Sequence, residues 1–359
     1  MSLSTPLCEL LGCKYPIIQT AMGWVAGADL VAASGNAGAF GFLAGATIPA
    51  QDMEAEILRI KQLSDAPFGV NFHMYQPNAG EIIDLVIKHK VRAVSYSRSP
   101  GADMIAKLKD HGVVCMPTVG LPKHALKAIE LGADAVTVQG GEGGGHTGAI
   151  PTSLLIPQVV DAVAGRVPVA AAGGFQDGRG LVAALAWGAS GIAMGTRFFM
   201  SEEASPPEVT KQRYVDCHDP AEIIVSKALD GLPQRMINNE TLARLERAGA
   251  AQKLFIAFSN GIKYRKFTGA SIFSLIKSAV AMTRSGDITL AQAIMSANAP
   301  MIIQKSMIDG DPEHGVLPSG QVAGVIDEVK PCAEIIQSIV EEAEQRLAAL
   351  AAMHQSGDS

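Results

Sequence analysis

The stretch His124-Ala-Leu-Lys-Ala-Ile-Glu-Leu-Gly-Ala-Asp-Ala-Val-Thr-Val-Gln139 decides the fold, because it contains one complete helix–turn–strand unit. Residues 124–131 have helical spacing, Gly132 is placed to end the helix in the left-handed conformation, and residues 135–139 form an apolar run. The stretch 179–195 repeats this order, with Gly188 between its helical window and its run. We interpret the two stretches as copies of one structural module.

Short apolar runs recur eight times through the first two hundred residues, and helical windows separate them. Their hydrophobicity is almost continuous, which is typical of parallel strands that are buried on both faces. The runs are 16–21, 39–43, 68–72, 93–97, 113–119, 135–139, 167–172 and 191–195. Eight such βα units predict a (β/α)8 TIM barrel, with a doubly wound open sheet as the alternative.

The pattern changes after about residue 205. Residues 206–290 show helical windows and no clear strand, so we expect a smaller, all-helical accessory domain that covers one mouth of the barrel as a substrate lid. The tail carries a turn at 317–324 and a helix at 332–353 that would cover the barrel as its eighth helix. The predicted organisation is a barrel of residues 1–205 and 291–359 with a helical lid of residues 206–290.

Composition limits the classes of protein that the chain can represent. The 359 residues are 48% hydrophobic with a formal net charge of −6, which supports a large core and argues against a nucleic-acid surface or a basic membrane anchor. The sequence has no strongly apolar run of about 18 residues and no signal-peptide pattern at its start. The five cysteines are scattered without a C-x-x-C pair, so we expect free thiols in the cytoplasm and no metal ligands.

Glycines follow the last two apolar runs, where a barrel would place its active site. Gly173 and Gly174 follow the seventh run, and Gly195 and Thr196 follow the eighth. Because glycine lets backbone N–H groups approach an anion closely, these loops predict a phosphate site. Tight turns without a ligand are the alternative interpretation.

The loop after the sixth run is Gly140-Gly-Glu-Gly-Gly-Gly-His-Thr-Gly148. Such an open loop costs conformational entropy on folding, which favours close approach to a flat or bulky ligand. His146 is its candidate acid, base or hydrogen-bond donor, with a purely structural histidine as the alternative. Asn71 and Gln139 end two of the runs and are candidate polar contacts, or they bridge loop backbone. Residues 22–24 offer backbone donors and a tryptophan, which is either a ligand wall or core.

At these residues the chain resembles the nitronate monooxygenase (2-nitropropane dioxygenase) family of FMN-dependent barrels, which is also similar to flavin-type enoyl reductases. The matching stretches are 16–24, 67–71, 140–148, 172–180 and 194–198. The resemblance is greatest to members that act on coenzyme A thioesters in bacterial steroid ring C/D breakdown. That part rests on residues 139–148, 297–301 and 315–325.

The resemblance implies FMN in the mouth of the barrel. The implied FMN contacts are Ala21, Met22 and Gly23 at the ring, Asn71 and Gln139 at its polar edge, Gly144 and Gly145 beside it, and Gly173, Gly174, Gly195 and Thr196 at the phosphate. His146 matches the family's catalytic histidine. Thr118 and Gln139 stand where several members have Lys and Asp, so the charge beside the ring differs from theirs.

The activity implied by the resemblance is that of an FMN-dependent oxidoreductase that oxidises or hydroxylates a carbonyl or acyl-CoA substrate and passes electrons to O2 or another acceptor. Alternatives are a nitronate monooxygenase, an enoyl-reductase-like or NAD(P)H:quinone flavin reductase, and a barrel isomerase or phosphate-binding protein without redox chemistry. The basic residues Lys263, Arg265 and Lys266 are candidates for contact with the phosphates of coenzyme A or form a solvated surface. A homo-oligomer is left open.

Overall fold

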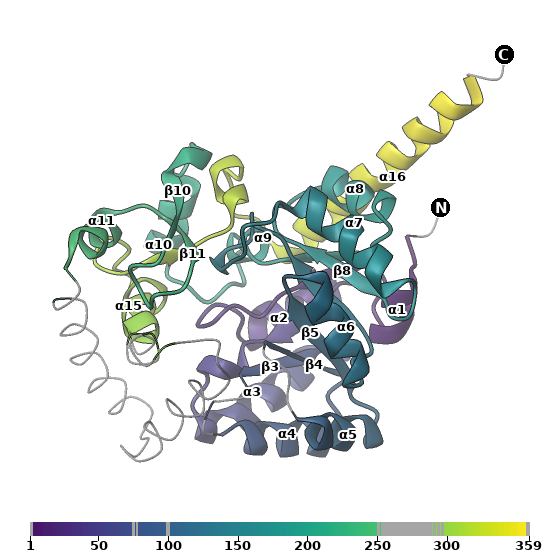
Figure 1. Cartoon of the computed structure of the whole chain (residues 1–359), viewed down its shortest axis with the longest axis horizontal. Helices are drawn as coiled ribbons and strands as arrows, with labels where there is room; N and C mark the ends of the chain where they lie inside the picture. Colours follow the sequence, from purple (N-terminus) through teal and green to yellow (C-terminus); the bar gives the residue numbers. More distant parts are fainter. Residues whose placement is uncertain are drawn as a thin grey trace.

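The computed structural model of the chain describes residues 3–73, 76, 78–97, 101–249, 252, 289, 292, 295 and 298–356. Its larger part is a closed barrel of eight parallel strands surrounded by helices, which confirms the predicted TIM barrel (Figure 1). The strands in barrel order are β1 (Ile17–Gln19), β2 (Phe40–Leu43), β3 (Gly69–His73), β4 (Ala93–Ser97), β5 (Val114–Val119), β6 (Val136–Gln139), β8 (Val169–Ala172) and β9 (Gly191–Met194), and β9 pairs with β1. Each predicted run overlaps one of them.

Helices cover the outside of the barrel. They are α2 (Ala28–Asn36), α3 (Ala50–Leu63), α4 (Ala79–Lys88), α5 (Ala102–Asp110), α6 (Pro122–Glu130), α7 (Thr152–Val163), α8 (Gly178–Ala186) and α16 (Cys332–Ser356). Gly132 and Gly188 have φ angles of 103° and 87°, so both occupy the left-handed position after a helix, as predicted. α16 packs between α8 and α2 and is the eighth helix that the sequence predicts.

The inside of the barrel is filled by a buried cluster of small and large side chains. Ala93, Ala135, Ala170, Ala172 and Ala193 share one buried cluster with larger residues of neighbouring strands. The short helix α1 (Pro6–Leu11) contributes two buried leucines to this cluster and so closes the amino-terminal end of the barrel.

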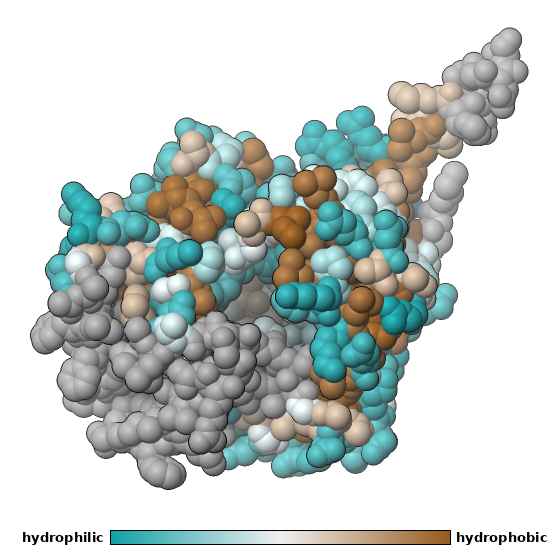
Figure 2. All heavy atoms as spheres, viewed as in Figure 1, coloured by the Kyte–Doolittle hydropathy of each residue, from teal (hydrophilic) through white to brown (hydrophobic). Residues whose placement is uncertain are grey.

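The C-terminal part of α16 projects beyond the body of the molecule (Figure 1). Figure 2 shows tan and brown residues along this projection, where Leu350 and Met353 are exposed. Among the described helices, none combines the length and apolar character needed to cross a membrane. All five cysteines are free thiols, and four of them are buried.

A smaller unit packs beside the barrel, and it is not all-helical as the sequence predicts. Its sheet joins β10 (Ile223–Ser226), β11 (Gln234–Ile237), β12 (Leu317–Pro318) and the two-residue strand β7 (Gly145–His146) of the glycine-rich loop. The helices around it are α10 (Glu208–Val215), α11 (Glu240–Arg247) and α15 (Asn298–Met307). The prediction was wrong because these strands are short and find their partners far away in sequence, so no local pattern marks them.

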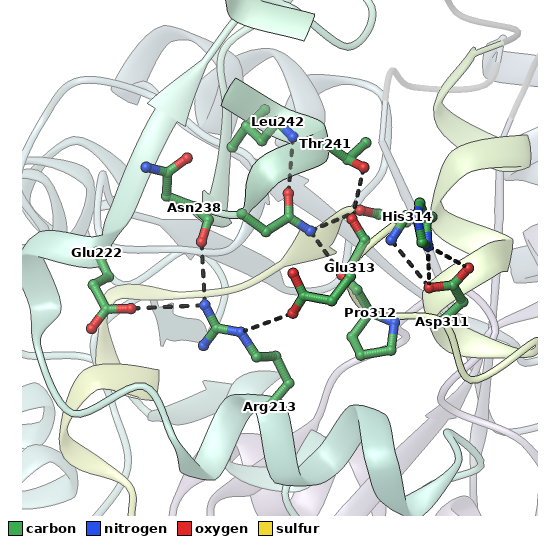
Figure 3. Close-up of polar contacts among 11 residues, drawn as sticks. Arg213, Glu222, Asn238, Thr241, Leu242, Asp311, Pro312, Glu313 and His314 are labelled. Carbon is green, nitrogen blue, oxygen red and sulfur yellow. Dashed lines mark hydrogen bonds and ion pairs between the residues drawn. The ribbon is translucent and has the colours of Figure 1, made fainter. Parts of the chain in front are cut away.

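Polar contacts hold the smaller unit together, as Figure 3 shows. Asn239 follows β11 and accepts a hydrogen bond from the Leu242 N–H, which caps α11, while its amide donates to the Pro312 and Gly315 carbonyls at 2.7 and 2.9 Å. Ile302 and Val316, which the predicted boundary assigned to the barrel, belong to the core of this unit. The limits at residues 206 and 290 stay a prediction, since residues 253–288 lie outside the described part.

Short helical turns complete the described chain. They are η1 (Gly45–Thr47), α9 (Thr196–Phe199), η2 (Pro220–Glu222) and η3 (Gln321–Val325). Three of them lie next to the carboxyl ends of barrel strands or to the smaller unit: α9 packs against η3, and η3 packs against η2. The tail of the chain therefore connects the end of β9 with the smaller unit.

Candidate active site

The glycine loops after β8 and β9 form an open cradle at the carboxyl ends of these neighbouring strands. Gly173 and Gly174 have φ angles of 94° and 85°, a conformation that favours glycine. Within the described part of the chain, the backbone N–H groups of Gly173, Gly174, Gly195 and Thr196 donate no hydrogen bond. Gly174 is exposed and the other three residues are half-buried, so these four donors are available to a ligand.

The loop after β1 lies against this cradle. A Cβ atom built on Gly195 would be 3.4 Å from the Sδ atom of Met22, so the predicted ring contact and the predicted phosphate contact are neighbours. Gly23 approaches Thr47 so closely that a Cβ atom would be 2.8 Å from its Cγ2 atom, and Thr47 also accepts a hydrogen bond from the Trp24 N–H at 3.1 Å. Trp24 packs against the main core, which supports the core interpretation of this tryptophan.

The glycine-rich loop 140–148 is fixed between the cradle and the tail of the chain. A Cβ atom on Gly173 would be 3.1 Å from the Gly143 nitrogen, and one on Gly144 would be 2.5 Å from the Gly320 nitrogen. A larger residue at position 144 would therefore collide with the turn at Ser319–Gly320. This close approach is a reason for the glycine that the sequence does not reveal, since the two segments are about 175 positions apart along the chain.

Two charged residues hold this loop in place. Glu142 accepts hydrogen bonds from the N–H and hydroxyl of Thr152 at 2.8 and 2.5 Å, at the start of α7. Arg235 of β11 donates to the Gly141 carbonyl at 2.8 and 3.1 Å and also to the Gln321 side chain. Burial lowers the pKa of Arg235, while the charge of Glu142 acts in the opposite direction. An arginine stays charged under such a shift, so it binds the loop carbonyl strongly.

His146 belongs to β7 and pairs with a buried carboxylate of the smaller unit. Its Nε2 atom lies 2.8 Å from Oδ2 of Asp230, whose side chain is 3% exposed, whereas the histidine side chain is 58% exposed. Gln139 donates from its amide to the His146 carbonyl at 2.9 Å, so these two predicted site residues are in direct contact. One nitrogen of the imidazole thus contacts a buried carboxylate, while more than half of the histidine side chain is exposed.

Asn71 lies on β3, across the barrel from the cradle. Its amide donates to Oγ and to the carbonyl of Ser95 on β4, at 3.0 and 3.1 Å. Two positions further along the same strands, His73 and Ser97 are also in contact, with Nδ1 and Oγ 3.1 Å apart. Polar side chains therefore connect the carboxyl ends of β3 and β4. The described residues show no contact between Asn71 and the other predicted site residues.

Several site residues escaped the sequence analysis. Asp230, Gln234 and Arg235 come from a hairpin that the sequence analysis did not recognise, and Ser95 and Gln321 make contacts that connect separate segments. The dipeptide Asp230-Gly231 is a turn signal and could have revealed the hairpin, because Gly231 has a φ angle of 84°. The basic residues 263–266 lie outside the described residues.

A parallel barrel with a glycine-lined rim and a histidine at its mouth defines a class of ligand-binding enzymes, and the comparison with known families is specific. The chain belongs to the nitronate monooxygenase family, whose sequence model matches residues 4–342. It is therefore an enzyme of an oxidoreductase family, as the sequence analysis predicted.

Individual relatives narrow the comparison further. The chain is 44% identical to a Mycobacterium tuberculosis protein over 96% of this chain and 97% of the relative, and 46% identical to a Rhodococcus jostii protein over 98% and 99%. Both are named (3aS,4S,5R,7aS)-5-hydroxy-7a-methyl-1-oxo-octahydro-1H-indene-4-carboxyl-CoA dehydrogenase. Among solved structures, FabK from Thermotoga maritima matches with a TM-score of 0.78 and 29% identity, over 97% of this chain and 99% of FabK.

Proposed function

We propose that the chain is an FMN-dependent dehydrogenase that oxidises the carboxyl-CoA thioester of a fused-ring, steroid-derived substrate. The observation that carries this proposal is that the glycine cradle and the His146–Asp230 pair both lie at the carboxyl ends of the barrel strands. The cradle offers donors for a phosphate and the histidine offers a group for proton transfer. The two relatives that share nearly the whole chain support the class of substrate.

The cradle fits the phosphate of FMN. Among the described residues no group accepts a hydrogen bond from the four backbone N–H groups of the cradle, so all four can donate to a phosphate at the rim. Side chains at Gly173 and Gly174 would be strained by their positive φ angles, and a Cβ atom on Gly173 would crowd the Gly140 carbonyl at 3.1 Å. The residues present therefore match the requirements of a bound phosphate.

The rest of the rim supplies the remaining contacts. Met22 lies beside the cradle and would contact the ring together with Ala21 and Gly23, while Asn71 and Gln139 would bind its polar edge. Gly145 leaves space near His146, because a Cβ atom there would meet no described atom within 4 Å. Thr118 would place no positive charge near the ring.

The chain's own residues would carry the proton transfer. FMN, when bound, would take a hydride from the substrate. His146 would remove the proton from the carbon next to the thioester carbonyl, which is the acidic position of such a substrate. Loss of a proton and a hydride from adjacent carbons leaves a carbon–carbon double bond. The electron acceptor that restores the cofactor would be O2 or another compound.

Two further expectations belong to this proposal. The free thiols fit a reducing compartment, which supports a cytoplasmic enzyme. Contact between the coenzyme A phosphates and residues 263–266, and assembly as a homo-oligomer, stay predictions.

The test is anaerobic reduction of the bound cofactor. We expect a yellow protein from which denaturation releases FMN, identified by chromatography against FMN and FAD. A fused-ring carboxyl-CoA thioester should bleach the visible flavin band, and the same acid without coenzyme A should not. A colourless protein that takes up no FMN would contradict the cofactor assignment.

Nitronate monooxygenase activity is the second candidate, because the matching family carries that name. Propionate-3-nitronate is the discriminating substrate in the same assay. Bleaching by the nitronate together with no response to the CoA thioester would favour this alternative over the dehydrogenase.

A further inference from the structure

Asp230 is the buried partner of the candidate catalytic histidine, and its surroundings determine how it can act. Its carboxylate accepts hydrogen bonds from the Gln234 amide at 2.7 Å and from the Leu232 N–H at 3.0 Å. The Gln234 amide and Nε2 of His146, which lies 2.8 Å away, converge on the same oxygen, Oδ2. Because both carboxylate oxygens already act as acceptors, Nε2 of His146 faces an acceptor.

Backbone hydrogen bonds and strand pairing on both sides of His146 hold this residue next to Asp230. β7 pairs with β11 so that His146 lies opposite Gln234, and the Thr147 N–H donates to the Pro233 carbonyl at 3.1 Å. Gln139 holds the His146 carbonyl from the barrel side. The histidine is therefore attached to both the barrel and the smaller unit, and its Nε2 atom faces an acceptor.

We infer that Asp230 is a positioning residue that holds neutral His146 in the tautomer with the proton on Nε2. The second ring nitrogen, Nδ1, is then unprotonated, and it makes no hydrogen bond to the residues that the structure describes. Nδ1 is thus the atom that takes the proton from the substrate, and the Asp230 carboxylate stabilises the imidazolium that results. This inference rests on the proposed function only for the identity of the substrate proton.

Gln234 makes the arrangement sensitive to the identity of residue 230. The side chain of an Asp230→Asn variant has two orientations. With its NH2 group at the Oδ2 position, that group would face the NH2 group of Gln234; with its oxygen there, the NH2 group would face the Leu232 N–H. In either orientation, two hydrogen-bond donors face each other. The tautomer of His146 should then no longer be fixed, although the size and shape of the side chain are unchanged.

The tautomer is measured directly by NMR on the full-length protein labelled with 15N-histidine. The His146→Gln variant assigns the resonances of this residue by their disappearance. We expect a protonated Nε2 and an unprotonated Nδ1 in the wild-type protein, and a mixture of tautomers in Asp230→Asn. A wild-type His146 protonated on Nδ1 alone would overturn the inference, whatever the protein's substrate.

Activity provides the second readout. We expect Asp230→Asn to lower kcat by about 10²- to 10⁴-fold with a much smaller change in KM, as when a buried aspartate behind a catalytic histidine is replaced. Asp311→Asn is the matched control, since Asp311 contacts His314 at 2.9 Å but its side chain is 44% exposed. Asp230→Asn with an unchanged tautomer and unchanged kcat would also overturn the inference.

The two proposals fail in different ways. The NMR measurement needs no substrate, so a CoA thioester that does not reduce the cofactor would remove the proposed function and leave the tautomer result standing. If Asp230→Asn does not fold, the wild-type spectrum still decides, because the tautomer is read there without any substitution at residue 230.

Discussion

The barrel and the smaller unit contribute to the site in opposite ways. The barrel supplies backbone, because its loops present glycines whose N–H groups are available. The smaller unit supplies charged side chains, with Asp230 behind the histidine and Arg235 on the loop carbonyl. The difference supports our proposal that the barrel would bind the cofactor and that the smaller unit would control the acid–base group.

This division also explains why β7 is part of the smaller unit's sheet although it belongs to a barrel loop. Pairing of two residues with β11 is a short interaction, but it places His146 next to the buried carboxylate. A loop that is rich in glycine has no rigid geometry of its own. The smaller unit provides that geometry, so the following substitutions separate the contributions of the two regions.

The largest effect is expected from His146→Ala. Loss of the proton-transfer group should lower turnover by about 10²- to 10⁴-fold, the usual contribution of general acid–base catalysis, while the flavin remains bound. Turnover with the CoA thioester and the visible absorbance of the protein measure the two properties. His314→Ala, which removes an exposed histidine of the smaller unit, is the control and should keep both. Unchanged turnover in His146→Ala would remove this histidine from the mechanism.

Gly174→Val tests the barrel side of the comparison. A β-branched residue at a φ angle of 85° is strained by about 1–2 kcal/mol, and its Cβ atom would lie 3.4 Å from Cβ of Glu142, next to the cradle. We expect the flavin to bind at least about tenfold more weakly, as measured by titration of the apoprotein with FMN. Gly148→Val is the control, because a Cβ atom there meets nothing within 4 Å. Full retention of FMN in Gly174→Val would count against the phosphate assignment.

Gly144→Ala tests the contact between the glycine-rich loop and the tail. The added methyl group would lie 2.5 Å from the Gly320 nitrogen and 2.6 Å from the Ser319 carbonyl carbon, so the backbone must move. We expect a loss of about 1–3 kcal/mol in the free energy of unfolding, measured by urea denaturation. Gly148→Ala should be almost neutral. Equal stability of the two variants would show that the loop and tail separate easily.

The smallest effect is expected from the exposed pair Asp311 and His314. The hydrogen bond from His314 holds the pKa of Asp311 below its ordinary value of 3.8, so the pair stabilises the folded protein above that pH and loses this effect as the pH falls through the lower folded pKa. Asp311→Asn should therefore lower Tm slightly at pH 7 and not at pH 2. Thermal unfolding at both pH values measures the difference, and a larger gap at the lower pH would contradict the assignment.

Much of the barrel could be predicted because its signals are local. Strands buried on both faces are almost entirely apolar, as in residues 135–139. Gly132 and Gly188 end helices in the left-handed conformation that glycine favours. Gly173, Gly174 and Gly195 could be recognised because chain order places them after strands, and a closed parallel barrel brings all strand ends to one rim. The position of a residue along the chain was sufficient for these assignments.

The smaller unit could not be predicted in the same way. β10 and β11 have four residues each. β11 pairs with β10 along one edge, and its other edge pairs with His146 and Gly145 of β7 and with Leu317 and Pro318 of β12. Nothing in a window around Asp230 indicates that its carboxylate contacts His146, since the two residues are 84 positions apart along the chain. The prediction of an all-helical lid failed for this reason.

The barrel, the glycine-lined rim proposed for the ligand and the candidate catalytic histidine could all be read from local sequence, because hydrophobic burial and glycine geometry are properties of neighbouring residues. The contact of Asp230 with this histidine and the close approach of Gly144 to Ser319–Gly320 became visible only in the folded chain. Both join segments that are far apart in sequence, and such proximity is created by folding and is not encoded in any local pattern.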